Sequence, residues 1–219
     1  MFPEAVIFDL DGTLIDNNPY HIEAWKFFYN KISKPFSKEE YTKNINGRIN
    51  TDIFNYIFNT TLTPEQTELY SNEKEAMYRE LYKKHIKPIN GLINFLDELE
   101  KEKVPKAIAT SGLSANINFM FAHVPIKKYY TNVIDASQVT KGKPHPEIFL
   151  KAAASVDANP KNCVAFEDSI TGIRSAKSAG MKVVGLTTTH TAEEIHEADL
   201  LINDYTEISL TKLRELQSD

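Results

Sequence analysis

The sequence predicts an α/β fold in which a doubly wound parallel sheet carries a helical lobe inserted after its first strand. Residues 5–8 indicate that first strand, because they are continuously apolar, as in strands buried on both faces of a parallel sheet. From Pro88 onward, short apolar runs alternate with helical patterns, which is typical of parallel strands joined by right-handed crossovers. Between these regions, roughly residues 17–86 show helical patterns and no strand pattern.

Composition and charge narrow the class of protein. A chain of 219 residues can form one core plus a small second lobe, and 42% hydrophobic residues with 25% charged residues are ordinary for a globular protein. The net charge of -5 argues against nucleic-acid binding, which requires a basic face. No segment has the pattern of a signal peptide or a membrane span, and the single cysteine, Cys163, lies in an apolar run as a candidate core residue. We therefore expect a cytoplasmic protein that binds neither nucleic acid nor membrane.

The inserted lobe has recognisable helix signals. Apolar residues recur at helical spacing in two segments, and Thr51 is a candidate N-cap for the second. Thr63 and Gln66 form a capping box with a proline at the first helical position, and this helix is expected to run to about Lys84. The two apolar segments are residues 22–32 and 53–58.

The rest of the chain alternates between strand and helix patterns. Gly180 stands where a glycine commonly ends a helix, and Thr191 with Glu194 indicates a further capping box. The expected strands are residues 106–110, 132–136, 162–166, 182–186 and 200–202. The expected helices are residues 91–101 and 169–179, and one that begins at Pro146.

Two aspartates follow the first strand, and a glycine turn follows them. Asp9 and Asp11 come at the end of the buried run, immediately before Gly12. Because ligands of open α/β sheets bind beyond the carboxyl ends of the strands, both carboxylates are candidates for a reaction centre. The alternative interpretation is a turn in which the acidic residues cap the element that follows.

Polar motifs follow later strands as well. Thr110-Ser111-Gly112 offers hydroxyl and backbone N–H groups for an anion, or alternatively a helix N-cap. Lys143 is either a counter-charge in a site or a solvated surface lysine. Glu167-Asp168-Ser169 is either an acidic ligand set or the cap of the next helix. Together, the acidic sites can hold Mg²⁺, and the lysine and the hydroxyl can hold phosphate oxygens, which suits phosphoryl transfer through an aspartyl-phosphate.

The order of these motifs resembles that of the haloacid dehalogenase (HAD) superfamily, in particular its branch of small phosphatases and β-phosphoglucomutases. The resemblance implies a Rossmann-like catalytic core of residues 1–16 and 87–219, and a helical cap of residues 17–86 that determines the substrate. It also implies a Mg²⁺ cofactor, a small phosphorylated metabolite as substrate, and a monomer. The motifs are Asp-Leu-Asp-Gly-Thr (9–13), Ala-Thr-Ser-Gly (109–112), Gly-Lys-Pro-His-Pro-Glu (142–147) and Phe-Glu-Asp-Ser-Ile-Thr-Gly-Ile (166–173).

The resemblance also assigns roles to the motif residues. Asp9 is implied to be the nucleophile and a metal ligand, and Asp11 the general acid and base whose carbonyl also faces the metal. Lys143 is implied to steady Asp9 and the phosphate charge. Asp168 is implied to bind the metal, with Glu167 binding it directly or through water. Thr110, with Ser111 and Gly112, is implied to bind the transferring phosphoryl group.

Three residues of the lobe are candidates for substrate contact. His21 resembles a mutase histidine that assists proton transfer, although packing near Trp25 explains it equally well. Lys74 falls roughly where the mutase has a lysine, but an exposed lysine in a Glu/Lys-rich helix is the preferred interpretation. Arg48 stands in the loop around Gly47, as in many phosphatases of this branch.

Two departures favour a phosphatase over a β-phosphoglucomutase. The mutase pattern has an arginine three residues after the glycine of the cap loop, where this chain has Asn50, and a threonine where it has Asn17. Arg48 could hold a second phosphate if the loop is bent differently. The prediction is therefore a Mg²⁺-dependent phosphohydrolase acting on a small metabolite such as a sugar phosphate, with the mutase second and a non-catalytic binding protein of the same fold third.

Overall fold

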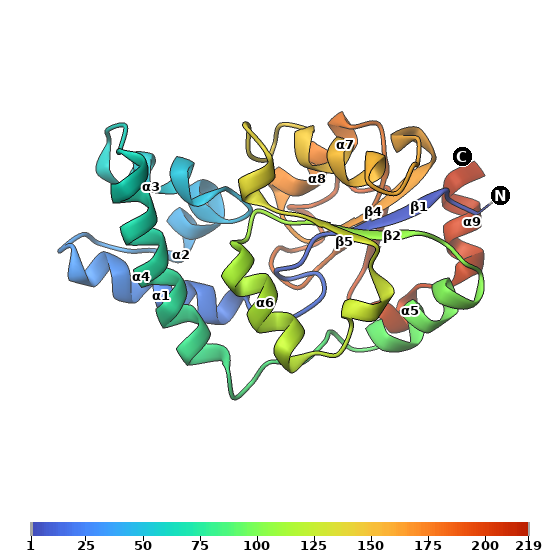
Figure 1. Ribbon diagram of the computed structural model, residues 1–219, viewed down its shortest axis with the longest axis horizontal. Coiled ribbons are helices and arrows are strands. Elements are labelled where there is room, and N and C mark those ends of the chain that lie inside the picture. Colours follow the sequence, from blue (N-terminus) through green and yellow to red (C-terminus); the bar gives the residue numbers. More distant parts are fainter. Residues whose placement is uncertain (1, 219) are drawn as a thin grey trace.

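The computed structural model describes residues 2–218, and these form a six-stranded sheet in which all strands are parallel (Figure 1). The strand order is β3-β2-β1-β4-β5-β6. The chain proceeds outward from β1 to β3 and then returns to β4 on the other side of β1, so β1 and β4 flank the switch point where such sheets bind ligands. The predicted doubly wound sheet is confirmed. The strands are β1 (Ala5–Phe8), β2 (Lys106–Ala109), β3 (Asn132–Ile134), β4 (Cys163–Glu167), β5 (Lys182–Leu186) and β6 (Leu200–Ile202).

Helices cover both faces of the sheet (Figure 1). On one face, α7 (Glu147–Ala154) and α8 (Ile170–Ser178) pack against Ala5 and Ile7 of β1. On the other face, Val6 and Phe8 lie in a cluster with residues of three helices beside the sheet, and Ala24, Tyr78 and Tyr82 of the inserted segment join the same cluster. This alternation explains why the whole of β1 is apolar, since neither face of the strand reaches water. The three helices are α5 (Leu92–Lys101), α6 (Ser114–His123) and α9 (Leu210–Ser218).

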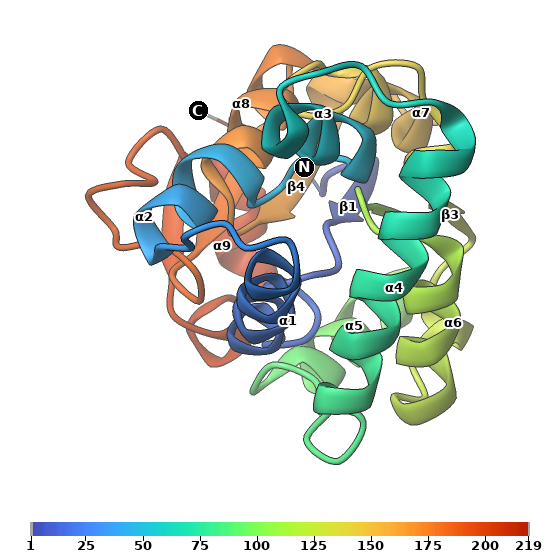
Figure 2. The ribbon, with the colours of Figure 1, turned by 90° about the vertical axis from the view of Figure 1, so that its left-hand side faces the viewer.

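The segment between β1 and α5 is helical and lies at the end of the sheet where β1 ends (Figures 1 and 2). It has an apolar cluster of its own, centred on Trp25 and Phe54 and separate from the two clusters of the sheet. The chain crosses to this layer and back through adjacent segments, where the Ile89 N–H donates to the Leu14 carbonyl over 3.0 Å. Its elements are α1 (Asn18–Lys31), α2 (Lys38–Glu40), a π-helical turn (Tyr41–Ile45), α3 (Asn50–Phe58) and α4 (Pro64–Tyr82).

The helix starts of the inserted segment test the N-cap residues that the sequence predicted. The capping box of α4 is confirmed: Gln66 N donates to Thr63 Oγ1 over 3.3 Å, and Thr63 N donates to Gln66 Oε1 over 3.0 Å. The predicted N-cap at Thr51 is wrong, because α3 already includes Asn50 and its N-cap is Ile49.

A second capping box forms without a helix. Thr191 N donates to Glu194 Oε2 over 3.0 Å, and Glu194 N donates to Thr191 Oγ1 over 3.4 Å. The predicted capping box is therefore confirmed, but the chain continues as turns up to β6. The reciprocal hydrogen bonds stabilise one turn, but they do not supply the packing that extends it.

Two expectations about the chain as a whole concern Cys163 and membranes. Cys163 is buried in β4, so the prediction of a core residue is confirmed, and burial raises the pKa of its thiol to about 12. Within residues 2–218, no helix combines the length and the apolar character needed to cross a bilayer. The cytoplasmic location stays a prediction.

Candidate active site

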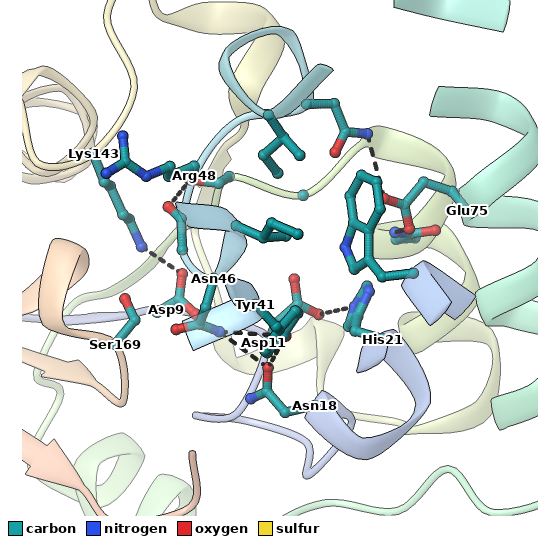
Figure 3. A pocket seen from close by; sticks show the side chains of 18 of the residues that line it. Asp9, Asp11, Asn18, His21, Tyr41, Asn46, Arg48, Glu75, Lys143 and Ser169 are labelled. Atoms are coloured by element: carbon teal, nitrogen blue, oxygen red, sulfur yellow. Dashed lines mark hydrogen bonds and ion pairs between the residues drawn. The ribbon is translucent and has the colours of Figure 1, made fainter. Parts of the chain in front are cut away.

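The predicted motif residues meet at the carboxyl ends of the central strands. Asp9 follows β1, Thr110 follows β2 and Asp168 follows β4, and parallel pairing brings these ends to one edge of the sheet. Asp9 and Asp168 line a cavity of about 70 Å³ between the sheet and the helical layer, and Ser111 and Gly112, which follow Thr110, line it as well (Figure 3). This volume is well below the roughly 300 to 1,000 Å³ of typical ligand pockets, because side chains of the helical layer reach close to the sheet here.

Lys143 is the counter-charge of the site. Its Nζ lies 2.6 Å from Asp9 Oδ1 and 2.5 Å from Glu167 Oε1, and the residue is only 2% exposed. The alternative of a solvated surface lysine is therefore wrong. Burial lowers the pKa of Lys143, but the two carboxylates outweigh this effect and raise it above its ordinary value. The ammonium stays charged and fixes the direction of Asp9.

Asp9, Glu167 and Asp168 form a buried acidic cluster whose ligand oxygens lie within 4.8 Å of one another. Burial raises the pKa of Asp9, helped by the charges of Glu167 and Asp168 and opposed by Lys143. Burial and the neighbouring Glu167 raise the pKa of Asp168 to about 8. When all three acids are ionised, their charge exceeds that of the one ammonium, and hard oxygen donors of this kind suit a divalent cation such as Mg²⁺.

The three acids are not equivalent as ligands. Both Glu167 oxygens are engaged, one by Lys143 and the other by Ser169, whose N–H and hydroxyl donate over 2.7 and 2.9 Å. Both Asp168 oxygens also accept hydrogen bonds, Oδ1 from Thr13 Oγ1 over 3.1 Å and Oδ2 from Asn18 Nδ2 over 3.2 Å and from Thr189 Oγ1. These partners are uncharged, which favours Asp168 over Glu167 as a direct ligand of a cation. The helix-capping role considered for this motif belongs to Ser169, which accepts from the Gly172 N–H at the start of α8.

Asp11 has a different environment from Asp9. Its Oδ1 accepts from Asn17 Nδ2 over 2.5 Å. The same oxygen lies 3.6 Å from His21 Nε2 (Figure 3). Burial raises the pKa of Asp11, but the nearby His21, Asn17 and Lys74 outweigh burial, so that the pKa falls below its ordinary value. The carboxylate of Asp11 therefore lies on the side of the helical layer, outside the acidic cluster.

Gly12 makes this separation of the two aspartates possible. Its φ is +77°, a conformation that residues with a side chain rarely adopt. A Cβ atom there would lie 2.2 Å from Asp168 Oδ2. The turn after β1 therefore packs directly on the acidic cluster, and only glycine fits.

His21 is a buried residue of α1 that faces Asp11. The ring is 8% exposed and stacks on Tyr78 at 3.8 Å with an interplanar angle of 8°. Lys74 Nζ lies 2.7 Å from His21 Nδ1. Because an ammonium only donates, Nδ1 accepts this bond and Nε2 carries the proton of the neutral ring. Nε2 makes no hydrogen bond within residues 2–218, so this N–H is directed toward Asp11 and the cavity.

Lys74 is buried, and the preferred prediction of an exposed lysine is wrong. It is 3% exposed, binds Glu75 Oε1 at 3.0 Å and lies 4.7 Å above the ring of Trp25. Burial lowers its pKa despite the charge of Glu75. The sequence did contain a signal for the burial of Lys74, because the buried polar and aromatic positions of α4 recur at helical spacing on one face. These positions are Ser71, Lys74, Glu75, Tyr78 and Tyr82.

The loop after β2 presents hydroxyl and N–H groups to the cavity. Thr110 Oγ1 accepts from the Gly112 N–H over 2.9 Å, which leaves the hydroxyl proton free to donate to a ligand. The N-cap alternative is wrong for Thr110, because α6 begins at Ser114 with Leu113 as its N-cap. Ser111 and Gly112 line the cavity beside it.

The loop of the helical layer around Gly47 docks on the sheet side of the site. Ser111 Oγ donates to the Gly47 carbonyl over 3.0 Å, and Thr171 Oγ1 donates to the Asn46 carbonyl over 3.3 Å. Gly47 has a φ of +74°, and a Cβ there would lie 2.3 Å from Thr171 Oγ1. Arg48 lines the cavity on the Lys143 side (Figure 3), and its Nε makes no hydrogen bond within the described residues.

Several site residues were not predicted from the sequence. Asn18 contacts Asp168, Tyr78 supports His21, and Glu75 and Asn116 complete the far end of the cavity. Asn17 was noted only as a departure from the mutase pattern, yet it donates to Asp11. A polar pair before a proline predicts a helix start, and nothing in the local pattern shows that its amides reach a carboxylate.

Comparison with known proteins decides the family. Residues 6–186 match the family model described as haloacid dehalogenase-like hydrolase. The chain belongs to this family. A β-phosphoglucomutase of Bacillus subtilis (strain 168) is 33% identical over 97% of this chain and 94% of that protein. A validoxylamine A 7'-phosphate phosphatase of Streptomyces hygroscopicus subsp. limoneus is 30% identical over 94% of this chain and 95% of that protein.

A solved structure has the same fold over the whole chain. The crystal structure of a HAD hydrolase, family IA, variant 3, from Entamoeba histolytica superposes with a TM-score of 0.88 and 34% identity, covering 98% of this chain and 99% of that chain. The predicted family and fold class are thus confirmed. The prediction of an enzyme, a hydrolase of the phosphatase type, is confirmed at the level of the family.

Proposed function

We propose that this chain is a Mg²⁺-dependent phosphohydrolase that removes phosphate from a small phosphorylated metabolite through an aspartyl-phosphate on Asp9. The observation that carries the proposal is the difference in environment between two neighbouring carboxylates. Asp9 lies in the acidic cluster with Lys143 2.6 Å away, whereas Asp11 lies beside Asn17 and the histidine of the helical layer. One carboxylate is placed to attack phosphorus and the other to move protons.

The carboxylates of Asp9 and Asp168 and the backbone carbonyl of Asp11 would hold the metal ion, with Glu167 holding Lys143 beside them. When bound, the ion supplies the positive charge that lets an anionic nucleophile approach an anionic phosphate. Lys143 supplies charge at the same place, and its two carboxylate partners fix its position. The free hydroxyl proton of Thr110 and the N–H groups of its loop are available to the phosphoryl oxygens.

The first half-reaction forms a bond between an Asp9 carboxylate oxygen and phosphorus, and the bond from phosphorus to the substrate oxygen breaks. Asp11, in its protonated form, gives its proton to that leaving oxygen. The negative charge of a phosphate beside Asp11 raises the pKa of Asp11 and so favours the protonated form. Lys143 acts on Asp9 in the opposite direction, because its charge lowers the pKa of Asp9 and favours the ionised form.

In the second half-reaction a water oxygen attacks phosphorus while the Asp11 carboxylate accepts the proton of that water. The bond between phosphorus and Asp9 breaks, which releases phosphate and restores the Asp9 carboxylate. His21 Nε2–H points toward Asp11 and is held in that tautomer by Lys74, so the pair orients the carboxylate through both steps.

We also propose that residues 17–86 act as a cap on a core of residues 1–16 and 87–219. The separate apolar cluster of the helical layer and the small closed cavity support this division. A cap in this position excludes bulk water from the phosphoryl group and brings His21 to Asp11. The monomeric state, the location and the absence of a nucleic-acid partner stay predictions.

A β-phosphoglucomutase is the second candidate. The 33% identical relative of that name and the bond between His21 and Lys74 favour it. Against it, Asn50 stands where the mutase pattern has an arginine, and Asn50 Nδ2 lies 3.3 Å from Glu75 Oε1. The second departure, Asn17, is weaker evidence against a mutase, because Asn17 donates a hydrogen bond to Asp11 and a threonine at this position could do the same.

Phosphate release from a panel of phosphorylated metabolites with Mg²⁺, using Asp9→Asn as the blank, tests the proposal. We expect multiple turnovers with at least one sugar phosphate and none in the blank. Conversion of β-glucose 1-phosphate to glucose 6-phosphate with a bisphosphate primer, without phosphate release, would instead support the mutase. Inactivity in both assays would favour a non-catalytic binding protein, although the core residues of all four motifs are present and gathered at one site.

A further inference from the structure

The end of the cavity farthest from Lys143 is built from polar side chains that take no part in the proposed reaction. Glu75 is 4% exposed there and lies across the cavity from Lys143 (Figure 3). Its Oε2 accepts from Asn116 Nδ2 over 2.7 Å, and its Oε1 accepts from Asn50 Nδ2 over 3.3 Å. We call Asn50, Glu75 and Asn116 the distal cluster.

Two cations contact the distal cluster and are engaged by it: Lys74 Nζ pairs with Glu75, and Arg79 Nη1 donates to Asn116 Oδ1 over 2.7 Å. Lys74 is the ammonium nearest to Glu75, and it is already bonded to Glu75 Oε1 and to the His21 ring. Lys74 and His21 outweigh the effect of burial and hold the pKa of Glu75 below its ordinary value, so Glu75 is ionised at neutral pH. A phosphate dianion placed here would face a buried carboxylate, which disfavours it strongly.

The same groups are well suited to hydroxyls. A carboxylate accepts several hydrogen bonds, and each asparagine amide offers both a donor and an acceptor. Trp25, Ile45 and Ile53 also line the cavity and provide the apolar surface against which the C–H face of a sugar packs. A carboxylate and two amides beside an aromatic ring therefore match an uncharged polyhydroxylated group.

We propose that the distal cluster binds hydroxyl groups of an uncharged leaving group, so that the enzyme acts on monophosphates of sugars or polyols and discriminates against the corresponding bisphosphates. This inference rests on the proposed phosphohydrolase function, and it adds the substrate class. It also assigns Asn50, Glu75 and Asn116 as specificity-determining residues.

The distal cluster joins the two parts of the molecule. Asn116 belongs to α6 beside the sheet, whereas Glu75 and Arg79 belong to α4 of the helical layer. Arg79 Nη1 donates to Asn116 Oδ1 over 2.7 Å, so Asn116 is hydrogen-bonded to both Glu75 and Arg79 of the helical layer. A hydroxyl bound to Glu75 and Asn116 bridges both parts, which links recognition of the leaving group to closure over the phosphate.

The test compares matched substrates. Fructose 6-phosphate and fructose 1,6-bisphosphate differ by one phosphate, as do ribulose 5-phosphate and ribulose 1,5-bisphosphate, and p-nitrophenyl phosphate lacks sugar hydroxyls. We expect kcat/KM of the wild type to be about tenfold or more higher for the monophosphates. Asn50→Ala and Asn116→Ala should each lower kcat/KM for the sugar monophosphates by about tenfold and that for p-nitrophenyl phosphate by about threefold or less.

Matched variants keep the test decisive. Asn44→Ala removes an amide of the same layer that bonds Tyr56 Oη on the outside, and it should leave all substrate ratios unchanged. Asn50→Arg supplies a cation, and we expect it to raise kcat/KM for the bisphosphate relative to the monophosphate by about tenfold. If an alanine variant melts far below the wild type, its kinetic comparison is replaced by a binding measurement. In that measurement, Asp9→Asn is titrated with each fructose phosphate in Mg²⁺ by calorimetry, and we expect the monophosphate to bind more tightly.

Distinct outcomes separate the two proposals. If wild type hydrolyses p-nitrophenyl phosphate and Asp9→Asn does not, the phosphohydrolase stands. In that case, equal or faster hydrolysis of the bisphosphates, or equal losses on all substrates in the alanine variants, overturns the assignment of the distal cluster alone. If no monoester is hydrolysed by the wild type, the proposed function fails and this inference fails with it.

Discussion

The two ends of the cavity are constructed in different ways. The end at Asp9 is formed by residues that directly follow parallel strands, and its lysine is held by two carboxylates. The end at Glu75 is formed by side chains of helices, joined by hydrogen bonds across the boundary between the helical layer and the sheet. Under the proposed function, the sheet end carries out the chemistry and the helical end binds the leaving group of the substrate.

The largest effect is expected at the sheet end. Asp9→Asn keeps the shape of the side chain but removes the nucleophilic charge, so kcat should fall by about 10⁴-fold or more on every substrate. Lys143 retains Glu167 as a partner, so the melting temperature should change little. Initial rates and thermal melts with and without Mg²⁺ measure both quantities, and appreciable turnover by the variant would show that Asp9 is not the nucleophile.

A second change at the same end tests the counter-charge. Lys143→Met should lower kcat by about 10²- to 10³-fold and the free energy of unfolding by about 3 to 5 kcal/mol, because buried carboxylates lose their partner. Lys141→Met, two residues away and exposed, is the matched control and should change neither. If both variants behave alike, Lys143 has no special role.

The helical end should respond to pH through stability. The pKa of Glu75 lies below its ordinary value of 4.5 in the folded state, with Lys74, His21 and Asn116 as the groups that stabilise its charge against burial. As pH falls from about 4.5, the unfolded state takes up the proton first, so the stabilisation is present above this range and is lost below it. Glu75→Gln should therefore be less stable than wild type at pH 7, by about 3 kcal/mol, and the difference should shrink toward pH 3. Urea unfolding at several pH values measures this, and a difference independent of pH would contradict it.

The smallest effect is expected far from either end. Thr63→Ala removes the side-chain half of the capping box of α4, which should cost about 1 kcal/mol and lower the melting temperature by roughly 2 to 4 °C. The kcat should stay unchanged, because the cap lies on the surface. Thr60→Ala, also exposed and outside a helix, serves as the control.

The sheet end could be predicted from the sequence because its geometry follows from local rules. A strand that is apolar throughout must be buried on both faces, and parallel strands bring their following residues to one edge. Asp9, Thr110, Lys143 and Asp168 were therefore predicted together, although a buried lysine in a loop has no local signal of its own.

The helical end could not be predicted in the same way. Lys74 and Glu75 stand in a charged stretch of α4, where charge alone predicts solvent exposure, and only their spacing to Tyr78 and Tyr82 shows that they face inward. Asn116 lies within a helix of the other part, and its contact with Glu75 depends on how the two parts dock. Such contacts join residues distant in sequence, and no periodicity encodes them.

The measurement that tests the central claim most directly is capture of the phosphorylated enzyme. Wild type and Asp9→Asn are mixed with a radiolabelled sugar monophosphate and Mg²⁺, quenched with acid within one turnover, and digested for peptide mapping. The proposed mechanism predicts transient label on the peptide that contains Asp9, decaying as phosphate appears, and no label in the variant. A burst of free phosphate without label on that peptide, or label on another residue, would contradict it.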